Sequence, residues 1–182
     1  MNAIGFIELT SIARGIEATD RMLKAARVEV LASHPICAGK YVTLLSGDIA
    51  DVNTAIEVGV AAAGHFLVDK LILSNVHPDV YPAVSGAAEV PEVEALGVIE
   101  TFVCASCIVA ADIVAKAAQS KLLYIRLGMG LGGKAYLTFT GDVGSVESSM
   151  EAALRHFGED SGVVAAHCVI PRPHARMGEL VL

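Results

Sequence analysis

The sequence predicts an α+β protein built from two tandem βαββαβ domains. Its 182 residues suffice for two small domains. Residues 3–8 (AIGFIE) recur as residues 95–100 (ALGVIE), an offset of 92 that becomes 94 beyond the turn at residues 33–40. Each copy shows the same order of strand-like apolar runs and helical patterns, so we expect one fold to occur twice.

The order strand, helix, two strands, helix, strand is the ferredoxin-like arrangement. In the first copy, the predicted strands are residues 3–10, 28–33, 40–46 and 66–74, and the predicted helices are residues 11–26 and 49–64. In the second copy, the predicted strands are residues 95–101, 121–127, 133–140 and 162–169, and the predicted helices are residues 103–118 and 143–157. The predicted domains are residues 1–86 and 94–182, joined by a linker rich in Ala, Val, Pro and Glu.

Local signals support the individual elements. Ser11 is a plausible N-cap for the first helix, which carries Ile12, Ile16, Leu23 and Ala26 on one face. Asp48 follows a strand-ending glycine and is well placed to cap the second helix, whose inner face is expected to consist of small residues. The turn at residues 33–40 is bracketed by Pro and Gly and carries Cys37.

Composition excludes several classes of protein. A net charge of −7 without a basic cluster argues against nucleic-acid binding. No apolar run approaches the roughly 18 residues of a membrane span, and the first residues lack a secretory pattern, so we expect a cytoplasmic protein. The mean hydropathy of +0.58 suggests large contacts between subunits. The four cysteines are expected to be thiols or metal ligands rather than a disulfide framework.

Four strings make the sequence resemble a known family: GFIE at residues 5–8, D-x-M-x-K-A-A at 20–26, GDI at 47–49 and VIPRPH at 169–174. Together they resemble the shell domains of bacterial microcompartments (BMC), here in tandem. The resemblance implies a structural protein rather than an enzyme, assembled as a flat pseudohexameric homotrimer that tiles the shell. Other BMC shell proteins at the edges of the tile would be its partners, and encapsulated redox enzymes are further candidates.

Within this family, the sequence is most similar to propanediol-utilisation members, which carry Ile-Cys-x-Gly-Lys in the first pore turn and end in Ile-Pro-Arg-Pro-His. Both strings occur here, at residues 36–40 and 170–174. In the iron–sulfur subgroup, the matching cysteine of each subunit binds one shared [4Fe–4S] cluster on the threefold axis. Carried over, this implies that Cys37 is the metal ligand, in a pore that conducts electrons or carries the cluster.

The copies differ at the turn that would form the pore. Three copies of Cys37 supply three thiolates, one short of the usual four, so one iron would remain open to solvent or a small ligand. The second turn contains no cysteine. The predicted pore-lining and shell-edge residues are Ile36, Ala38, Gly39, Gly130, Leu131 and Gly132 at the pore, and Lys24, Lys116 and Arg172 at the edges.

Several alternatives remain open. Cys37 with His34 could offer mixed ligation to zinc, or the pore could hold no metal and pass small metabolites. A ferredoxin-like trimeric enzyme or regulator is a further alternative, although no nucleophile–base pair is visible. The G-x-G-x-x-G string at residues 128–133 precedes a predicted strand, not the helix that a dinucleotide site needs. Packing in the protein interior is expected for Cys104, Cys107 and Cys168.

Overall fold

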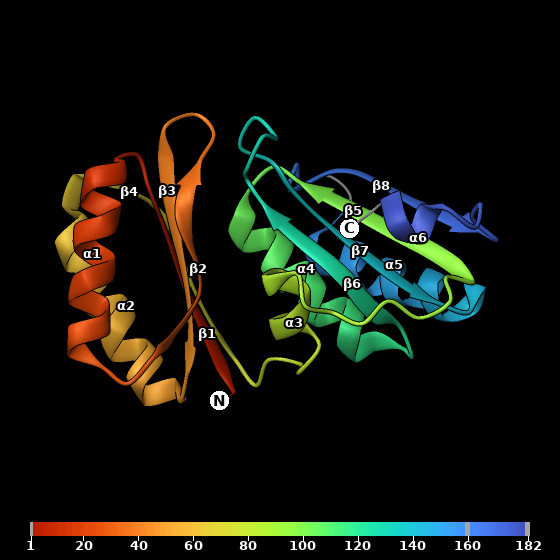
Figure 1. Ribbon diagram of the computed structural model, residues 1–182, viewed down its shortest axis with the longest axis horizontal. Helices are drawn as coiled ribbons and strands as arrows, with labels where there is room; N and C mark the ends of the chain where they lie inside the picture. Colours follow the sequence, from red (N-terminus) through yellow and green to blue (C-terminus); the bar gives the residue numbers. More distant parts are fainter. Residues whose placement is uncertain (1, 159–160, 181–182) are drawn as a thin grey trace. The chain divides into compact units, whose positions relative to one another are not determined.

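The computed structural model describes residues 2–158 and 161–180. The chain divides into two units, Met1–Val76 and His77–Leu182. Each unit contains one four-stranded antiparallel sheet with helices packed against it (Figure 1). The predicted α+β fold of two ferredoxin-like domains is confirmed. The last two residues of the predicted second domain, 181–182, lie outside the described residues.

Unit 1 follows the predicted order of elements. These are β1 Ala3–Leu9, α1 Ile12–Ala25, β2 Glu29–Ile36, β3 Lys40–Gly47, α2 Ile49–Ala63, a short 3-10 helix at Gly64–Phe66 and β4 Leu67–Ser74. The strand order is β2-β3-β1-β4, with β2 and β4 at the edges. The Ser11 side chain accepts a hydrogen bond from the backbone nitrogen of Arg14 and caps α1, as expected.

Unit 2 repeats this order after one additional helix. Its elements are α3 Val80–Ser85, β5 Ala95–Thr101, α4 Cys104–Ala117, β6 Lys121–Leu127, β7 Ala135–Gly141, α5 Val143–Phe157, β8 Val164–Pro171 and α6 Met177–Leu180. The strand order β6-β7-β5-β8 matches that of unit 1. Asp142 caps α5 by accepting from the backbone nitrogen of Ser145. Hydrogen bonds from the Ser145 hydroxyl and from its backbone nitrogen lower the pKa of the Asp142 carboxyl.

The short helices α3 and α6 were not predicted from the sequence. Each follows the last strand of its copy, β4 or β8. Helix α3 packs against α4 and β6 of unit 2, although its residues fall within the sequence range 1–86 expected for the first domain. A segment that follows the first copy therefore belongs structurally to the second.

One expectation about side-chain burial needs correction, and the structure shows where the apolar stripe of α1 lies. Cys168 is expected to be buried, but it is exposed on β8. The apolar residues predicted on one face of α1 are not on its core side: Ile16 is 56% exposed and Leu23 is 42% exposed. The buried side of α1 is formed instead by Gly15, Ala18, Thr19 and Met22. Among the described helices, none combines the length and apolar character needed to cross a membrane.

Candidate functional site

The Cys37 turn closes the hairpin of β2 and β3. The antiparallel register pairs Ile36 with Lys40, which leaves three residues, Cys37 to Gly39, in the connection. Gly39 has a φ of 75°, a left-handed conformation that favours glycine, and a Cβ added there would meet no atom within 4 Å. Pro35 lies within β2, which extends three residues beyond its predicted end. An edge strand tolerates this proline because one of its sides needs no ladder hydrogen bonds.

The predicted pore residues of the first turn differ in exposure. Ala38 and Gly39 are exposed, Cys37 is half-buried and forms no disulfide, and Ile36 is 5% exposed. The turn thus presents small groups next to one soft sulfur donor, a combination that suits a thiolate ligand approached closely by other groups. His34 is half-buried on β2, where its Nδ1 lies 3.2 Å from the carbonyl oxygen of Pro35.

An ion pair supports the base of this turn. Lys40 Nζ donates to Glu8 Oε1 at 2.8 Å, and the side chain of Glu8 is only 4% exposed. This contact joins the first residue of β3 to the end of β1. The second copy contains the same pair, Lys134 with Glu100, but there the glutamate side chain is 34% exposed. Lys40, three residues after Cys37 in the sequence, therefore neutralises the buried carboxylate of Glu8.

A chain of hydroxyl groups holds the same hairpin against α1. Thr19 Oγ1 and Thr43 Oγ1 are 2.6 Å apart, and Ser33 Oγ lies 3.3 Å from Thr43 Oγ1 and 3.0 Å from the hydroxyl of Tyr41. Thr19 also donates to the carbonyl of Gly15. Sequence reasoning missed this network, because its members are distant in the chain and no motif joins them.

The second turn is built differently. Four of its glycines have positive φ: Gly128, Gly130, Gly132 and Gly133. The backbone nitrogen of Gly128 donates to the carbonyl of Lys134, and strand β7 follows, as expected of a turn that is not a dinucleotide loop. Of the predicted pore residues here, Gly130 and Gly132 are exposed and Leu131 is half-buried. This turn offers backbone atoms but no thiol.

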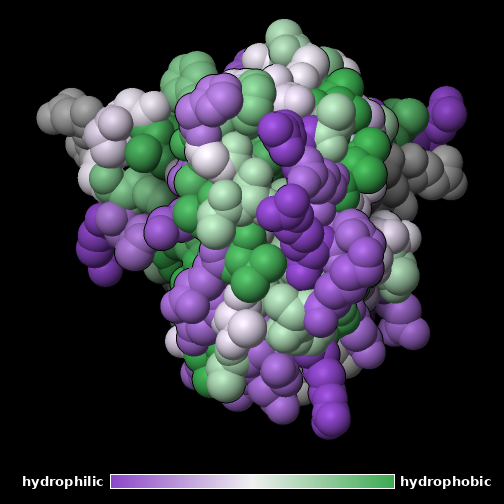
Figure 2. Space-filling view, turned by 90° about the vertical axis from the view of Figure 1, so that its left-hand side faces the viewer, coloured by the Kyte–Doolittle hydropathy of each residue, from purple (hydrophilic) through white to green (hydrophobic). Residues whose placement is uncertain are grey.

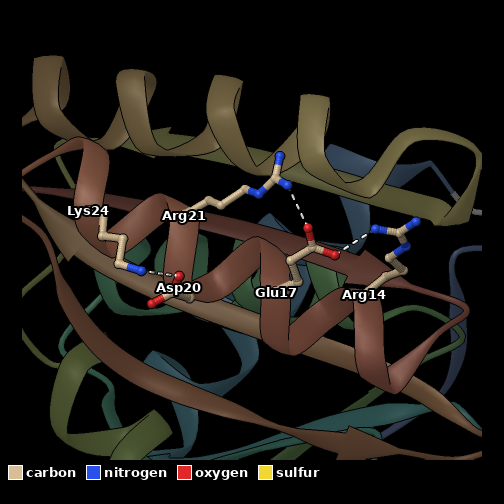
Figure 3. A network of polar contacts seen from close by, with 5 residues as sticks. All are labelled: Arg14, Glu17, Asp20, Arg21 and Lys24. Carbon is tan, nitrogen blue, oxygen red and sulfur yellow. Dashed lines mark hydrogen bonds and ion pairs between the residues drawn. The ribbon is translucent and has the colours of Figure 1, made fainter.

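The predicted edge lysines occupy equivalent positions in the two units. Lys24 and Lys116 each donate to the aspartate four residues earlier, at 2.6 Å in both cases. Figure 3 shows the Lys24–Asp20 pair on α1, beside a second cluster of Arg14, Glu17 and Arg21 on the same helix. Lys24 is 74% exposed and Lys116 is 39% exposed.

The predicted edge residue Arg172 follows β8 directly. It has a φ of 49°, is exposed, and donates its backbone nitrogen to the carbonyl of Glu94. The matching residue after β4 is Asn75, with a φ of 54°. The two copies therefore leave their last strands with the same backbone bend.

The remaining thiols are poor candidates for metal chemistry. Cys104 and Cys107 are buried, as expected, and burial raises the pKa of the Cys107 thiol far above its usual value. Within residues 2–158 and 161–180, no group of three or more His, Cys, Asp and Glu side chains could hold a metal ion.

The comparisons with known proteins identify the family. The BMC domain matches residues 3–76 and 95–173, which covers both sheets and their main helices. The chain therefore belongs to the BMC domain family of bacterial microcompartment shell proteins.

Relatives over the full length sharpen this assignment. The chain is 45% identical over 175 residues to the bacterial microcompartment shell protein PduT of Citrobacter freundii, covering 96% of this chain and 95% of PduT. The crystal structure of a microcompartments protein from Desulfitobacterium hafniense DCB has a TM-score of 0.94 and 49% identity, covering 98% of this chain and 99% of that chain. The resemblance to PduT-type members, first carried by residues 36–40 and 170–174, is confirmed.

A shorter relative shows the tandem organisation. The shell protein EutM of Salmonella typhimurium is 36% identical over 81 residues, which is 43% of this chain but 84% of EutM. One copy of the repeat thus corresponds to most of that protein. The predictions of a structural shell protein rather than an enzyme, located in a microcompartment shell within the cytoplasm, are confirmed by the family and its PduT relative.

Proposed function

We propose that this chain forms a homotrimeric shell tile in which three Cys37 thiolates, one from each subunit, hold a single [4Fe–4S] cluster on the threefold axis. The observation that carries the proposal is that Cys37 lies in the hairpin turn of the first copy, whereas the second copy has no cysteine in its turn. A ring of three chains then contains three such thiols. When bound, the cluster would supply one-electron redox chemistry.

The residues around Cys37 fit this role. Small neighbours, Ala38 and Gly39, leave room for three turns to approach one axis. The thiol is not sequestered in the core, in contrast to Cys107. Lys40 begins β3 directly after the turn, and its Nζ pairs with the buried carboxylate of Glu8. Its contact with Glu8 also anchors the turn to β1.

Two roles are compatible with a cluster at this position. A tile that spans the shell could pass electrons between the two sides, with encapsulated redox enzymes as partners on one of them. Alternatively, the tile could store the cluster and transfer it. Either role requires the tile to contact other shell proteins at its edges, for which Lys24, Lys116 and Arg172 are the proposed contact residues.

Anaerobic purification and reconstitution test the proposal. We expect a brown protein with broad visible absorption and about four iron and four sulfide per three chains. Native mass spectrometry should show a trimer carrying one cluster. Cys37→Ser should abolish the colour, whereas Cys168→Ser, which alters an exposed thiol elsewhere, should retain it. A protein that stays colourless after reconstitution, and is indistinguishable from Cys37→Ser, would refute cluster binding.

The same samples separate the alternatives. Stoichiometric zinc that is lost in both Cys37→Ser and His34→Ala would favour a mixed zinc site. A trimer without metal would favour a pore for small metabolites.

A further inference from the structure

The outer edge of β8 presents backbone groups that no strand of its sheet pairs. Strand β8 is the last strand of its sheet and pairs with β5 alone (Figure 1). The backbone nitrogen of Arg172, directly after β8, donates to the carbonyl of Glu94 on the β5 side. Because the direction of hydrogen bonding alternates along an antiparallel strand, the backbone groups of His167 and Val169 point away from β5.

The corresponding edge of the first sheet is closed. The counterpart of His167 on β4 is Lys70, and its backbone nitrogen donates to Oδ1 of Asp69 at 2.8 Å. Charged side chains on an edge strand hinder pairing with a further strand. Strand β8 contains no Asp, Glu, Lys or Arg, and its counterpart of Asp69 is Ala166. The edge of β8 is therefore open at the position where that of β4 is closed.

A surface hollow lies beside this open edge, between β8 and α5. The part next to the strand has a volume of about 520 Å³ and is lined by Leu154, Gly158, Val164, Ala165, Ala166 and His167. The adjoining part shares Leu154 and Gly158 and extends to Glu151 and Arg155 on α5. Small residues on both walls leave room for an apolar side chain. On β4, the larger Val68 occupies the position of Ala165.

Arg155 provides this hollow with an exposed cation. Its side chain is 79% exposed, and its guanidinium lies 3.7 Å from the carboxylate of Glu151. Figure 2 shows the side of unit 1 that α1 and α2 form, where hydrophilic side chains lie between hydrophobic patches. On α1, Arg14 and Arg21 each contact Glu17 at 2.6 Å (Figure 3). The longer, exposed contact of Arg155 contributes little, so a carboxylate brought by a ligand can compete for it.

We propose that β8 takes up an extended, acidic segment of a partner protein as an additional antiparallel strand. The backbone of this segment would bond to His167 and Val169, an apolar side chain would enter the hollow, and a carboxylate two residues away would pair with Arg155. Side chains two residues apart share one face of a strand, so both would reach the α5 side.

Charge favours such a partner over a second copy of this chain. Strand β8 has no acidic side chain, so pairing two β8 edges would bring no carboxylate from β8 to either Arg155. The site contains no residue of the Cys37 turn. Its test is therefore independent of cluster binding.

Hydrogen exchange of the full-length protein, resolved by NMR, tests the strand addition. The probe is the peptide acetyl-Thr-Val-Thr-Glu-Thr-amide, in which Val and Glu share one face. At a peptide concentration about ten times its dissociation constant, exchange of the His167 and Val169 amides should slow about tenfold, whereas that of Ile170, which faces β5, should not change. Unchanged exchange at His167 and Val169 with millimolar peptide would overturn the proposal.

Two methylated peptides separate strand pairing from other modes of binding. N-methylation of Val and Glu removes the donors that would face β8, whereas N-methylation of the first two Thr residues removes donors that would face solvent. We expect the first peptide to bind at least about tenfold more weakly than the unmodified probe and the second to bind nearly as well. Equal losses for the two peptides would contradict pairing with β8.

Variants of the hollow test the side-chain contacts. Arg155→Glu should weaken binding of the probe about fivefold and should favour the same peptide with Lys in place of Glu. Ala165→Phe should weaken binding to a similar extent by filling the hollow. Val68→Phe is the matched control, because Val68 occupies the same position on β4. Native mass spectrometry checks that the variants keep the oligomeric state of the parent protein. Equal effects of the two Phe variants, or an unchanged charge preference in Arg155→Glu, would also overturn the proposal.

Discussion

Removing the cation at the base of the Cys37 turn should cost far more stability than removing its counterpart in the second copy. In Lys40→Met, the carboxylate of Glu8, 4% exposed, loses its ion-pair partner. Breaking a fully buried pair in this way costs about 3–5 kcal/mol, and since Lys40 is 33% exposed we expect about 2 kcal/mol. In Lys134→Met, the partner Glu100 is 34% exposed, so we expect less than about 1 kcal/mol.

Thermal unfolding at a fixed protein concentration can measure this difference, since the stability of an oligomer depends on concentration. For a chain of this size, about 2 kcal/mol corresponds to a midpoint lowered by roughly 4–8 °C. The double variant Glu8→Gln/Lys40→Met should recover part of the loss, because it removes the buried charge as well as its partner. Equal losses for Lys40→Met and Lys134→Met, or no recovery in the double variant, would refute the reasoning.

Two further predictions concern packing and thiol reactivity. Gly15→Ala should lower the free energy of unfolding by about 1–3 kcal/mol through overpacking, because its Cβ would lie 2.4 Å from Tyr41 Cδ1. In the control Gly144→Ala, the added Cβ would meet no atom closer than 3.4 Å, so stability should change by less than about 1 kcal/mol. Denaturant titration would show whether the two variants differ. A maleimide at pH 8 should label the exposed Cys168 quickly. Cys107, whose pKa is raised by burial, should stay unlabelled until the protein unfolds. Peptide mass spectrometry measures both rates, and similar rates for the two thiols would contradict the prediction.

The sequence was informative where a pattern is local or repeated. Ser11 caps α1 as expected, and the offset between the copies placed all eight main strands and four main helices in the correct order. The two hairpin turns were recognisable because Pro35 and Gly39 bracket the first and glycines fill the second, and because strand-like segments follow both. The prediction for Cys37 came from the resemblance at residues 36–40 and from the lack of a cysteine in the second turn, since a single cysteine in a turn says little by itself.

What the sequence did not reveal depends on contacts between distant residues. The apolar residues of α1 form a periodic stripe, but periodicity does not say whether a stripe faces the core or a partner, and Ile16 and Leu23 are exposed. The exposure of Cys168 on β8 depends on which face of the sheet other elements cover. Helix α3 is too short to produce a periodic signal, and its stability comes from packing on α4 and β6.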